Sequence, residues 1–239
     1  MKEKTKKEIL ASVKKTYNSI AEDFSETRKM HWHEFEDFLK YIKDNDSIVD
    51  LGCGNGRLYH FLKDKRKIKY LGIDNSKNLL KEAEKNIKKE DIESKISNLK
   101  KSIPKFIEGD LLKIPARSSS AKVLACIAAF HHLPSKELRE KSLKEMHRVL
   151  QKNGKLLLTV WNLLKQPKYK DEVKKAKMRW LKTLGKYEKR GLLIPWGDKK
   201  IPRYYYTFKE KELEKLLKKY FKIIEKKVDK NLIYICEKL

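Results

Sequence analysis

Residues 49–56 read Val49-Asp50-Leu51-Gly52-Cys53-Gly54-Asn55-Gly56, and the fold class follows from this stretch. Its first residues form a short apolar run, which is typical of a buried strand. Three glycines at alternate positions then let the backbone turn tightly and approach a ligand where any Cβ would clash. A helical pattern begins directly afterwards, near Arg57–Lys63. A strand, a glycine loop and a helix in this order predict an α/β domain with a ligand site at the loop.

Further β-rich runs and helical patterns alternate along the chain. The runs expected to be strands are Ser47–Leu51, Lys69–Ile73, Lys105–Glu108, Lys122–Ala128 and Lys155–Trp161. The helical patterns between them lie near Arg57–Lys63, Lys77–Lys101 and Lys136–Leu150, the last with Ser135 as N-cap and Asn153-Gly154 as its end. Alternation of this kind predicts right-handed βαβ units and a parallel sheet.

The C-terminal part departs from this alternation. A helical pattern over Lys209–Lys219 precedes two β-rich runs, Tyr220–Val228 and Asn231–Cys236, which are close enough in sequence to form an antiparallel hairpin. We therefore expect one domain over residues 1–239, with a mostly parallel, seven-stranded sheet that carries this hairpin at its edge.

Two further segments lie outside the alternating units. Residues from about 6 to 24 and from 31 to 44 read as amphipathic helices, and we expect an N-terminal helical cap over residues 1–44. Residues 164–206 fit no strand. Because long excursions inside compact domains usually carry binding or lid functions, we expect a substrate-binding insertion or lid there.

The strongest feature of the composition is a large net positive charge. The formal net charge of +26 favours polyanions such as RNA, yet only nine of the 59 basic residues are arginine, and lysine loading of this kind can also reflect a biased genome. Both interpretations stay open.

The three cysteines, Cys53, Cys126 and Cys236, are far apart, which favours a reducing cytoplasm and argues against disulfides or a metal site. No apolar run approaches the ~18 residues that a membrane span needs.

Three acids lie at the ends of three successive expected strands. Asp50 stands two residues before the first glycine, Asp74 ends Leu71-Gly72-Ile73-Asp74, and Asp110 lies in Glu108-Gly109-Asp110-Leu111. The carboxyl ends of parallel strands meet at one edge of the sheet, where ligands of open α/β folds bind. The competing interpretation is three ordinary strand-end turns.

These residues suit S-adenosylmethionine. We expect its carboxylate to bind at the backbone of the glycine loop (Gly52, Gly54 and Gly56) and at the start of the following helix. Asp50 is expected to bind its amino group. Asp74 can take both ribose hydroxyls, while Asp110 and Leu111 face the adenine amino group and ring. A nicotinamide cofactor is disfavoured because the spacing is G-x-G-x-G rather than G-x-G-x-x-G.

Two histidines follow the fourth expected strand, in Ala129-Phe130-His131-His132-Leu133-Pro134. In this fold that strand end faces the transferred methyl group, so we expect His131 to line the active site and His132 to contact the substrate; the alternative is that both pack in the core. No Asn-Pro-Pro-Tyr motif for amino methylation occurs, and no cysteine is placed to attack C6 of a pyrimidine.

Two motifs resemble one family. The first is Tyr17-Asn18-Ser19-Ile20-Ala21-Glu22-Asp23-Phe24-Ser25-Glu26-Thr27-Arg28, with Trp32 four residues on; the second is Ile194-Pro195-Trp196 followed by Pro202-Arg203-Tyr204-Tyr205-Tyr206-Thr207-Phe208. Together with the His-His-Leu run, they resemble the eukaryotic-type tRNA wobble-uridine 5-carboxymethyl methyltransferases, within the type 11-like class I S-adenosylmethionine-dependent methyltransferases. Tyr206 stands where that family usually has histidine.

The resemblance implies a Rossmann-like class I methyltransferase fold and esterification of the carboxymethyl group of 5-carboxymethyluridine in tRNA. It implies that Arg28, His131 and Arg203 form a clamp for the reacting carboxylate, although Arg28 could instead hold the carboxylate of the cofactor. A carboxylate is ionised at pH 7, with a pKa near ~4, so this chemistry needs no general base.

The resemblance also implies partners and further contacts. Tyr17 is expected at the cofactor, and the residues expected to contact substrate are Trp32, His132, Trp196, Tyr204 and Tyr206. Aromatic rings among lysines suit an anticodon loop, whose bases stack and whose phosphates meet charge. The eukaryotic relatives also use a small zinc-binding activator subunit.

Two other classes of function fit parts of the pattern. A small-molecule O-, N- or C-methyltransferase would share the glycine loop, the histidines and the shorter Tyr-x-x-Ala motif. A non-catalytic RNA-binding protein of the same fold would not need to keep Asp50, Asp74 and Asp110 together.

Overall fold

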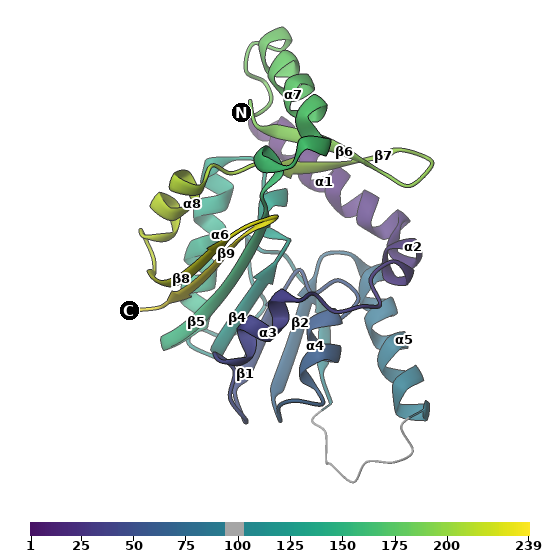
Figure 1. Cartoon of the computed structure of the whole chain (residues 1–239), viewed down its shortest axis with the longest axis vertical. Helices are drawn as coiled ribbons and strands as arrows, with labels where there is room; N and C mark the ends of the chain where they lie inside the picture. The colour runs from purple at the N-terminus through teal and green to yellow at the C-terminus, as the bar shows by residue number, and fades with distance from the viewer. Residues whose placement is uncertain (94–102) are drawn as a thin grey trace.

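The computed structural model describes residues 1–93 and 103–239, and its main sheet has seven strands (Figure 1). These are β1 (Ser47–Leu51), β2 (Lys69–Asp74), β3 (Lys105–Glu108), β4 (Ala121–Ile127), β5 (Leu150–Trp161), β8 (Lys222–Val228) and β9 (Asn231–Glu237). Their order across the sheet is β3-β2-β1-β4-β5-β9-β8. The first five strands pair in parallel, and β9 pairs antiparallel with both β5 and β8. The predicted fold class is thereby confirmed.

Helices cover both faces of this sheet because alternate strand residues face opposite ways. The helices are α1 (Glu3–Ser19), α2 (Ala21–Glu26), α3 (Glu34–Leu39), α4 (Arg57–Leu62), α5 (Lys77–Glu93), α6 (Lys136–Val149), α7 (Lys170–Lys182) and α8 (Glu210–Leu217). Leu124 and Leu158 face a core cluster built with α1, α6 and α8. Val123 and Leu157, each one residue away, face a second cluster built with α3 and α4.

The N-terminal residues fold differently in detail from the two helices predicted. The first pattern divides at Ile20, a buried residue that ends α1 and precedes α2. The second pattern forms only the short helix α3. The helix predicted over Lys77–Lys101 is present to Glu93, and its remaining residues lie outside the described part of the chain.

The strand β5 starts at Leu150, immediately after α6, rather than at Lys155 as predicted. Leu150 pairs with Ala121, and the register then shifts before Val123 pairs with Lys155. The turn at Asn153, which has a φ of 60°, therefore lies inside an irregular strand start and does not separate helix from strand.

The prediction that residues 164–206 contain no strand was wrong. After α7 the chain forms a separate two-stranded antiparallel hairpin of β6 (Gly191–Trp196) and β7 (Ile201–Tyr206). In Figure 1 the hairpin and α7 stand together at the top of the molecule, beyond the ends of β4 and β5. The hairpin is stabilised by tertiary packing: Leu192 and Tyr205 contact Leu163 and Ala176 in a third small core cluster.

Among the described residues, no helix is both long enough and apolar enough to span a bilayer.

Candidate functional site

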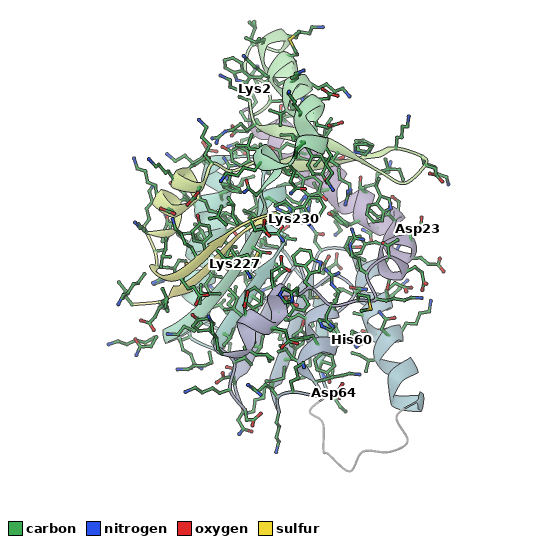
Figure 2. The ribbon with its side chains drawn as sticks, viewed as in Figure 1. Lys2, Asp23, His60, Asp64, Lys227 and Lys230 are labelled. Atoms are coloured by element: carbon green, nitrogen blue, oxygen red, sulfur yellow. The ribbon has the colours of Figure 1, made fainter. Side chains whose placement is uncertain are left out.

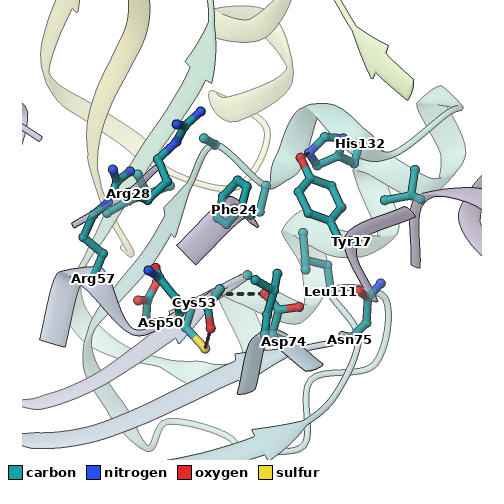
Figure 3. Close-up of a pocket in the computed structure, with 18 of the residues that line it drawn as sticks. Tyr17, Phe24, Arg28, Asp50, Cys53, Arg57, Asp74, Asn75, Leu111 and His132 are labelled. Atoms are coloured by element: carbon teal, nitrogen blue, oxygen red, sulfur yellow. Dashed lines mark hydrogen bonds between the residues drawn. The ribbon is translucent and has the colours of Figure 1, made fainter. Parts of the chain in front are cut away.

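A pocket lies at the carboxyl ends of the parallel strands, roofed by the N-terminal helices and β7 (Figure 3). Its lining includes most of the predicted site residues and several that were not predicted. The predicted residues that line it are Tyr17, Arg28, Trp32, Asp50, Gly52, Gly54, Asp74, Asp110, Leu111, His132 and Arg203. The remaining predicted residues, Gly56, His131, Trp196, Tyr204 and Tyr206, do not line it.

The glycine loop after β1 forms the floor of the pocket. Gly52 has a φ of +73°, and a Cβ there would come within 2.4 Å of the Ala129 Cβ, so only glycine fits. Gly54, with a φ of +55°, faces open space, where a Cβ would meet only Phe24 at 3.8 Å. The backbone of Gly54 is therefore accessible to a ligand. Gly56 instead packs against the core at the start of α4, near Ala83.

Two buried carboxyl groups flank this loop. Asp74 accepts hydrogen bonds from the backbone N–H groups of Gly54 (2.9 Å) and Ser76 (2.8 Å), which fix its orientation beside the loop. Asp50 accepts one from the hydroxyl of Tyr70. Burial raises the pKa of Asp50 to about 7, with Asp74 adding to the rise and the hydrogen bond from Tyr70 opposing it. Burial also raises the pKa of Asp74.

The third acid lies at the other end of the pocket. Asp110 and Leu111 follow β3, and the Asp110 carboxylate accepts a hydrogen bond of 2.7 Å from the backbone N–H of Leu112. Figure 3 shows Leu111 and Asn75 on the side of Asp74 away from Asp50. The three acids therefore follow one another along an elongated pocket, an arrangement that fits the amino acid, ribose and adenine parts of S-adenosylmethionine.

The N-terminal helices are fastened to the loops that form this floor. The Asn18 side-chain oxygen accepts hydrogen bonds from the Ser76 hydroxyl and the Asn78 backbone N–H, each 3.1 Å long. The Asn55 amide donates to the Ser25 hydroxyl at 3.2 Å. These contacts hold Tyr17, Phe24 and Arg28 above the glycine loop.

Of the two histidines, His132 faces the pocket and His131 lies behind it. The His132 Nδ1–H donates to the Tyr204 carbonyl at 2.6 Å, which leaves Nε2 to accept from the Tyr17 hydroxyl at 3.0 Å. The Tyr17 oxygen lies 3.3 Å from the Tyr205 hydroxyl, which is then the donor of that pair. Burial lowers the pKa of His132 to about 4, so this ring is neutral near pH 7.

His131 is 1% exposed and belongs to the core, contrary to its predicted place on the pocket wall. Its Nδ1 accepts a hydrogen bond of 3.2 Å from the backbone N–H of Trp161. The cause is the short 3-10 turn over Phe130–His132, which points adjacent side chains in different directions. His132 therefore replaces His131 as the histidine at the pocket.

Three arginines converge on the pocket, and one of them, Arg57, was missed in the sequence. Among the described residues, arginine–carboxylate ion pairs are formed by Arg139, Arg148 and Arg190, and by none of Arg28, Arg57 and Arg203. The three lie instead on aromatic faces: Arg28 on Phe24 and Trp196, Arg57 on Trp32 and Phe35, and Arg203 on Trp196, Tyr205 and Trp161. Arg203 is 4% exposed, and its Nε has no hydrogen-bond partner in the described part of the chain.

The aromatic residues of β7 divide between two faces, because side chains alternate along a strand. Arg203 and Tyr205 face the pocket, whereas Tyr204 and Tyr206 point away from it. Tyr206 donates to Glu212 and accepts from Arg190, each at 2.6 Å. Tyr204 and Tyr206, which were predicted to contact substrate, thus lie outside the pocket, whereas Tyr205 and Trp161 line it and stack with ring centroids 4.9 Å apart.

The cysteines offer no nucleophile. All three are buried and free, and only Cys53 lines the pocket. Burial raises the pKa of the Cys53 thiol well above its usual value, and the neighbouring Asp74 and Asp50 raise it further. The thiol therefore stays protonated near pH 7. Within the residues that the structure describes, no group of three histidine, cysteine or acidic side chains is arranged to hold a metal ion.

Comparison with known proteins agrees with this geometry. The methyltransferase domain family matches residues 49–158. The tRNA (carboxymethyluridine(34)-5-O)-methyltransferase alkbh8 of Xenopus tropicalis is 34% identical over 170 residues, which are 71% of this chain and 23% of that protein. The chain thus spans less than a quarter of the length of the first curated relatives that it matches.

Solved structures share the fold at low sequence identity. A SAM-dependent methyltransferase from Methanosarcina mazei has a TM-score of 0.69 and 21% identity, covering 88% of this chain and 99% of that one. A methyltransferase in complex with the Trm112 methyltransferase activator of Haloferax volcanii has a TM-score of 0.62 and 15% identity, covering 93% of this chain and 97% of that one. Residues 49–158, with their glycine loop and strand-end acids, form an S-adenosylmethionine-dependent methyltransferase domain, and the chain is similar to the tRNA carboxymethyluridine methyltransferases.

Proposed function

We propose that this protein methylates the carboxylate of 5-carboxymethyluridine at the wobble position of tRNA. The observation that carries the proposal is a pocket that joins three strand-end acids to three arginines which, within the described residues, form no ion pair with a carboxylate. Buried cations are costly unless they are paired, so such a site favours an anionic ligand. The similarity to the Xenopus enzyme supports a carboxymethyl carboxylate as that anion.

The chain's own acids would hold the cofactor. Asp50 would take its ammonium group, Asp74 its ribose hydroxyls, and Asp110 with Leu111 its adenine. When bound, S-adenosylmethionine supplies a methyl group made electrophilic by the sulfonium. The residues around the pocket would hold the substrate carboxylate oxygen in line with that methyl group, so that the new C–O bond would replace the S–C bond with the sulfur as leaving group, and no side chain would need to accept a proton.

The residues above the pocket would position the substrate without serving as a base. Arg203, with its unpartnered Nε, would orient the carboxylate, and the stacked Trp161 and Tyr205 would hold the uracil ring. His132 has a pKa of about 4, and its Nε2 accepts from Tyr17, so its role is to fix the Tyr17 hydroxyl. Catalysis then rests on orienting two groups that are already reactive.

The pKa of Asp50 gives the first prediction. With a pKa of about 7 in the free protein, Asp50 is roughly three-quarters protonated at pH 6.5. An ammonium group favours the carboxylate, so cofactor binding lowers this pKa, and Asp50 then releases up to about three-quarters of a proton at pH 6.5 and almost none at pH 8.5. Affinity therefore falls as the pH drops below 7. Calorimetry in buffers of different ionisation enthalpy measures the release.

Asp50→Asn is the matched variant for this experiment, because it keeps the shape of the side chain and cannot ionise. It is expected to bind S-adenosylmethionine more weakly with no proton release. If the wild-type protein at pH 6.5 gives the same binding enthalpy in every buffer, Asp50 does not hold the ammonium group.

The tRNA part of the proposal rests on α7 and its neighbours. Charged side chains project from the outside of the whole molecule (Figure 2), so net charge alone singles out no face. Beside α7, however, cations lie next to exposed apolar groups: Lys189 lies 5.1 Å over the Trp180 ring, and Met178 and Leu181 are each 52% exposed. Aromatic rings among cations suit unpaired RNA bases and their phosphates.

Reversing four lysines of this surface gives the second prediction. The variant with Lys170, Lys177, Lys182 and Lys186 changed to glutamate is expected to bind tRNA at least ~100-fold more weakly at low salt. Each phosphate that is no longer neutralised should reduce the slope of log affinity against log salt by about 0.7 to 0.9. Filter binding or fluorescence anisotropy across a salt series measures both quantities.

Four lysines at the opposite, amino-terminal ends of the strands serve as the control. Reversal of Lys67, Lys69, Lys122 and Lys152 changes the net charge equally and should leave most of the tRNA affinity and the slope intact. Equal losses in both variants would show that tRNA responds only to overall charge, and no loss in the first would remove α7 from the RNA-binding surface.

We extend the proposal to a partner and a compartment. The Haloferax structural neighbour is bound to the Trm112 activator, and we propose that this chain also works with a small activator of that kind. Three buried, free cysteines are compatible with the reducing cytoplasm, where we place the reaction.

A further inference from the structure

Arg57 is the first residue of α4 and directly follows the glycine loop. Its guanidinium carbon lies 4.8 Å from the centre of the Trp32 ring and 5.9 Å from that of Phe35. Its Nη1 donates to the Met30 carbonyl at 3.3 Å. The two rings and the carbonyl hold the guanidinium at the pocket wall, and most of its five N–H donors remain available to a ligand.

Asp50 and Arg57 stand on either side of the glycine loop. Both line the pocket, and Figure 3 shows them at the same end, while Asn75 and Leu111 mark the other end. An α-amino acid group carries one ammonium and one carboxylate on the same carbon. A carboxyl group and a guanidinium that flank an accessible backbone loop match that pair of charges.

We propose that Arg57 binds the carboxylate of the cofactor's amino acid group, and that Arg28 is thereby left to the substrate. The electrostatics of Arg57 agree with an anionic ligand. Burial and the nearby charge of Arg28 lower the pKa of Arg57 to about 10, and the charge of Glu34 offsets this only in part, so the guanidinium keeps its charge at pH 7. A bound carboxylate would offset the remaining cost of burial and repulsion.

Arg28 lies close to Arg203, on the same aromatic ring. The two guanidinium carbons lie 5.3 Å and 4.6 Å from the centre of the same Trp196 ring. Repulsion from Arg203 contributes, after burial, to a lowered pKa of Arg28. Two cations that share one aromatic ring form a site for one shared anion, and on the proposed function this anion is the carboxylate of the modified uridine. This second half rests on the proposed function, whereas the role of Arg57 does not.

The test compares S-adenosylmethionine with decarboxylated S-adenosylmethionine, which keeps the ammonium, sulfonium, ribose and adenine and lacks only the carboxylate. Calorimetry on the full chain without RNA gives the ratio of the two affinities. The wild-type protein is expected to prefer S-adenosylmethionine, and Arg57→Gln should reduce that preference by about tenfold or more. Arg57→Lys should retain part of it, since the charge is kept.

Arg28→Gln and Arg117→Gln are the matched variants. Arg117 is exposed and lies outside the pocket lining. Both variants should keep the full preference, and Arg28→Gln should nevertheless lose turnover on tRNA. The proposal is overturned if Arg57→Gln, shown by its melting curve to be folded, keeps the wild-type preference, or if Arg28→Gln loses it. Because no RNA is present, these outcomes are independent of whether tRNA proves to be the substrate.

Discussion

Replacing Arg203 with methionine is expected to lower kcat/KM for tRNA methylation by about 100- to 1,000-fold. Arg203 is almost fully buried, it lies on Trp196 and Tyr205, and its Nε has no hydrogen-bond partner among the residues that the structure describes. Removing it would leave the substrate carboxylate without the donor that orients it toward the methyl group. Methionine keeps the length and packing of the side chain, so the loss should reflect the missing charge and hydrogen bonds.

Arg179→Met is the control for this variant. Arg179 belongs to the same insertion, is half-buried, and donates to the Gly191 carbonyl, but it does not line the pocket. Single-turnover kinetics should show near wild-type rates for Arg179→Met and a strong loss for Arg203→Met, with unchanged S-adenosylmethionine affinity in both. Activity of Arg203→Met within threefold of wild type would contradict the substrate clamp.

The parts of the site that the sequence predicted are those set by local chain geometry. Glycines at alternate positions can be recognised without a structure, because positive φ and close backbone approach restrict the residue type. Asp50, Asp74 and Asp110 each lie at or just after the end of a strand, and parallel topology brings strand ends to one edge. The parallel topology therefore brings three acids that are distant in sequence into one pocket, and this could be predicted from the sequence.

The parts that it did not predict depend on which way a side chain points. Choosing between His131 and His132 requires the geometry of a 3-10 turn, and choosing between Tyr204 and Tyr205 requires a strand that was expected to be a loop. The alternation from Arg203 to Tyr205 was the available signal for the second choice. Arg57 was not predicted because the sequence alone does not distinguish it from a solvent-exposed residue in the first turn of a helix. Its contacts with the Trp32 and Phe35 rings are visible only in the structure.

The second large effect is selectivity for the modified nucleoside. No cysteine in the protein is ionised at the pocket, so C6 of an unmodified uridine cannot be activated by covalent attack. A uridine without the carboxymethyl group also lacks the nucleophile. Its methylation is therefore expected to be at least ~1,000-fold slower, which is the ratio that a difference of about 4 kcal/mol produces.

The most direct measurement incubates the purified protein, with and without a Trm112-type activator, with one tRNA prepared in two forms. One form carries 5-carboxymethyluridine at the wobble position and the other carries uridine, and mass spectrometry of the nucleosides identifies the product. The account predicts an alkali-labile methyl ester on the first form and no product on the second. A ring-methylated uridine, or methylation of a free metabolite while the carboxymethylated tRNA is ignored, would contradict it.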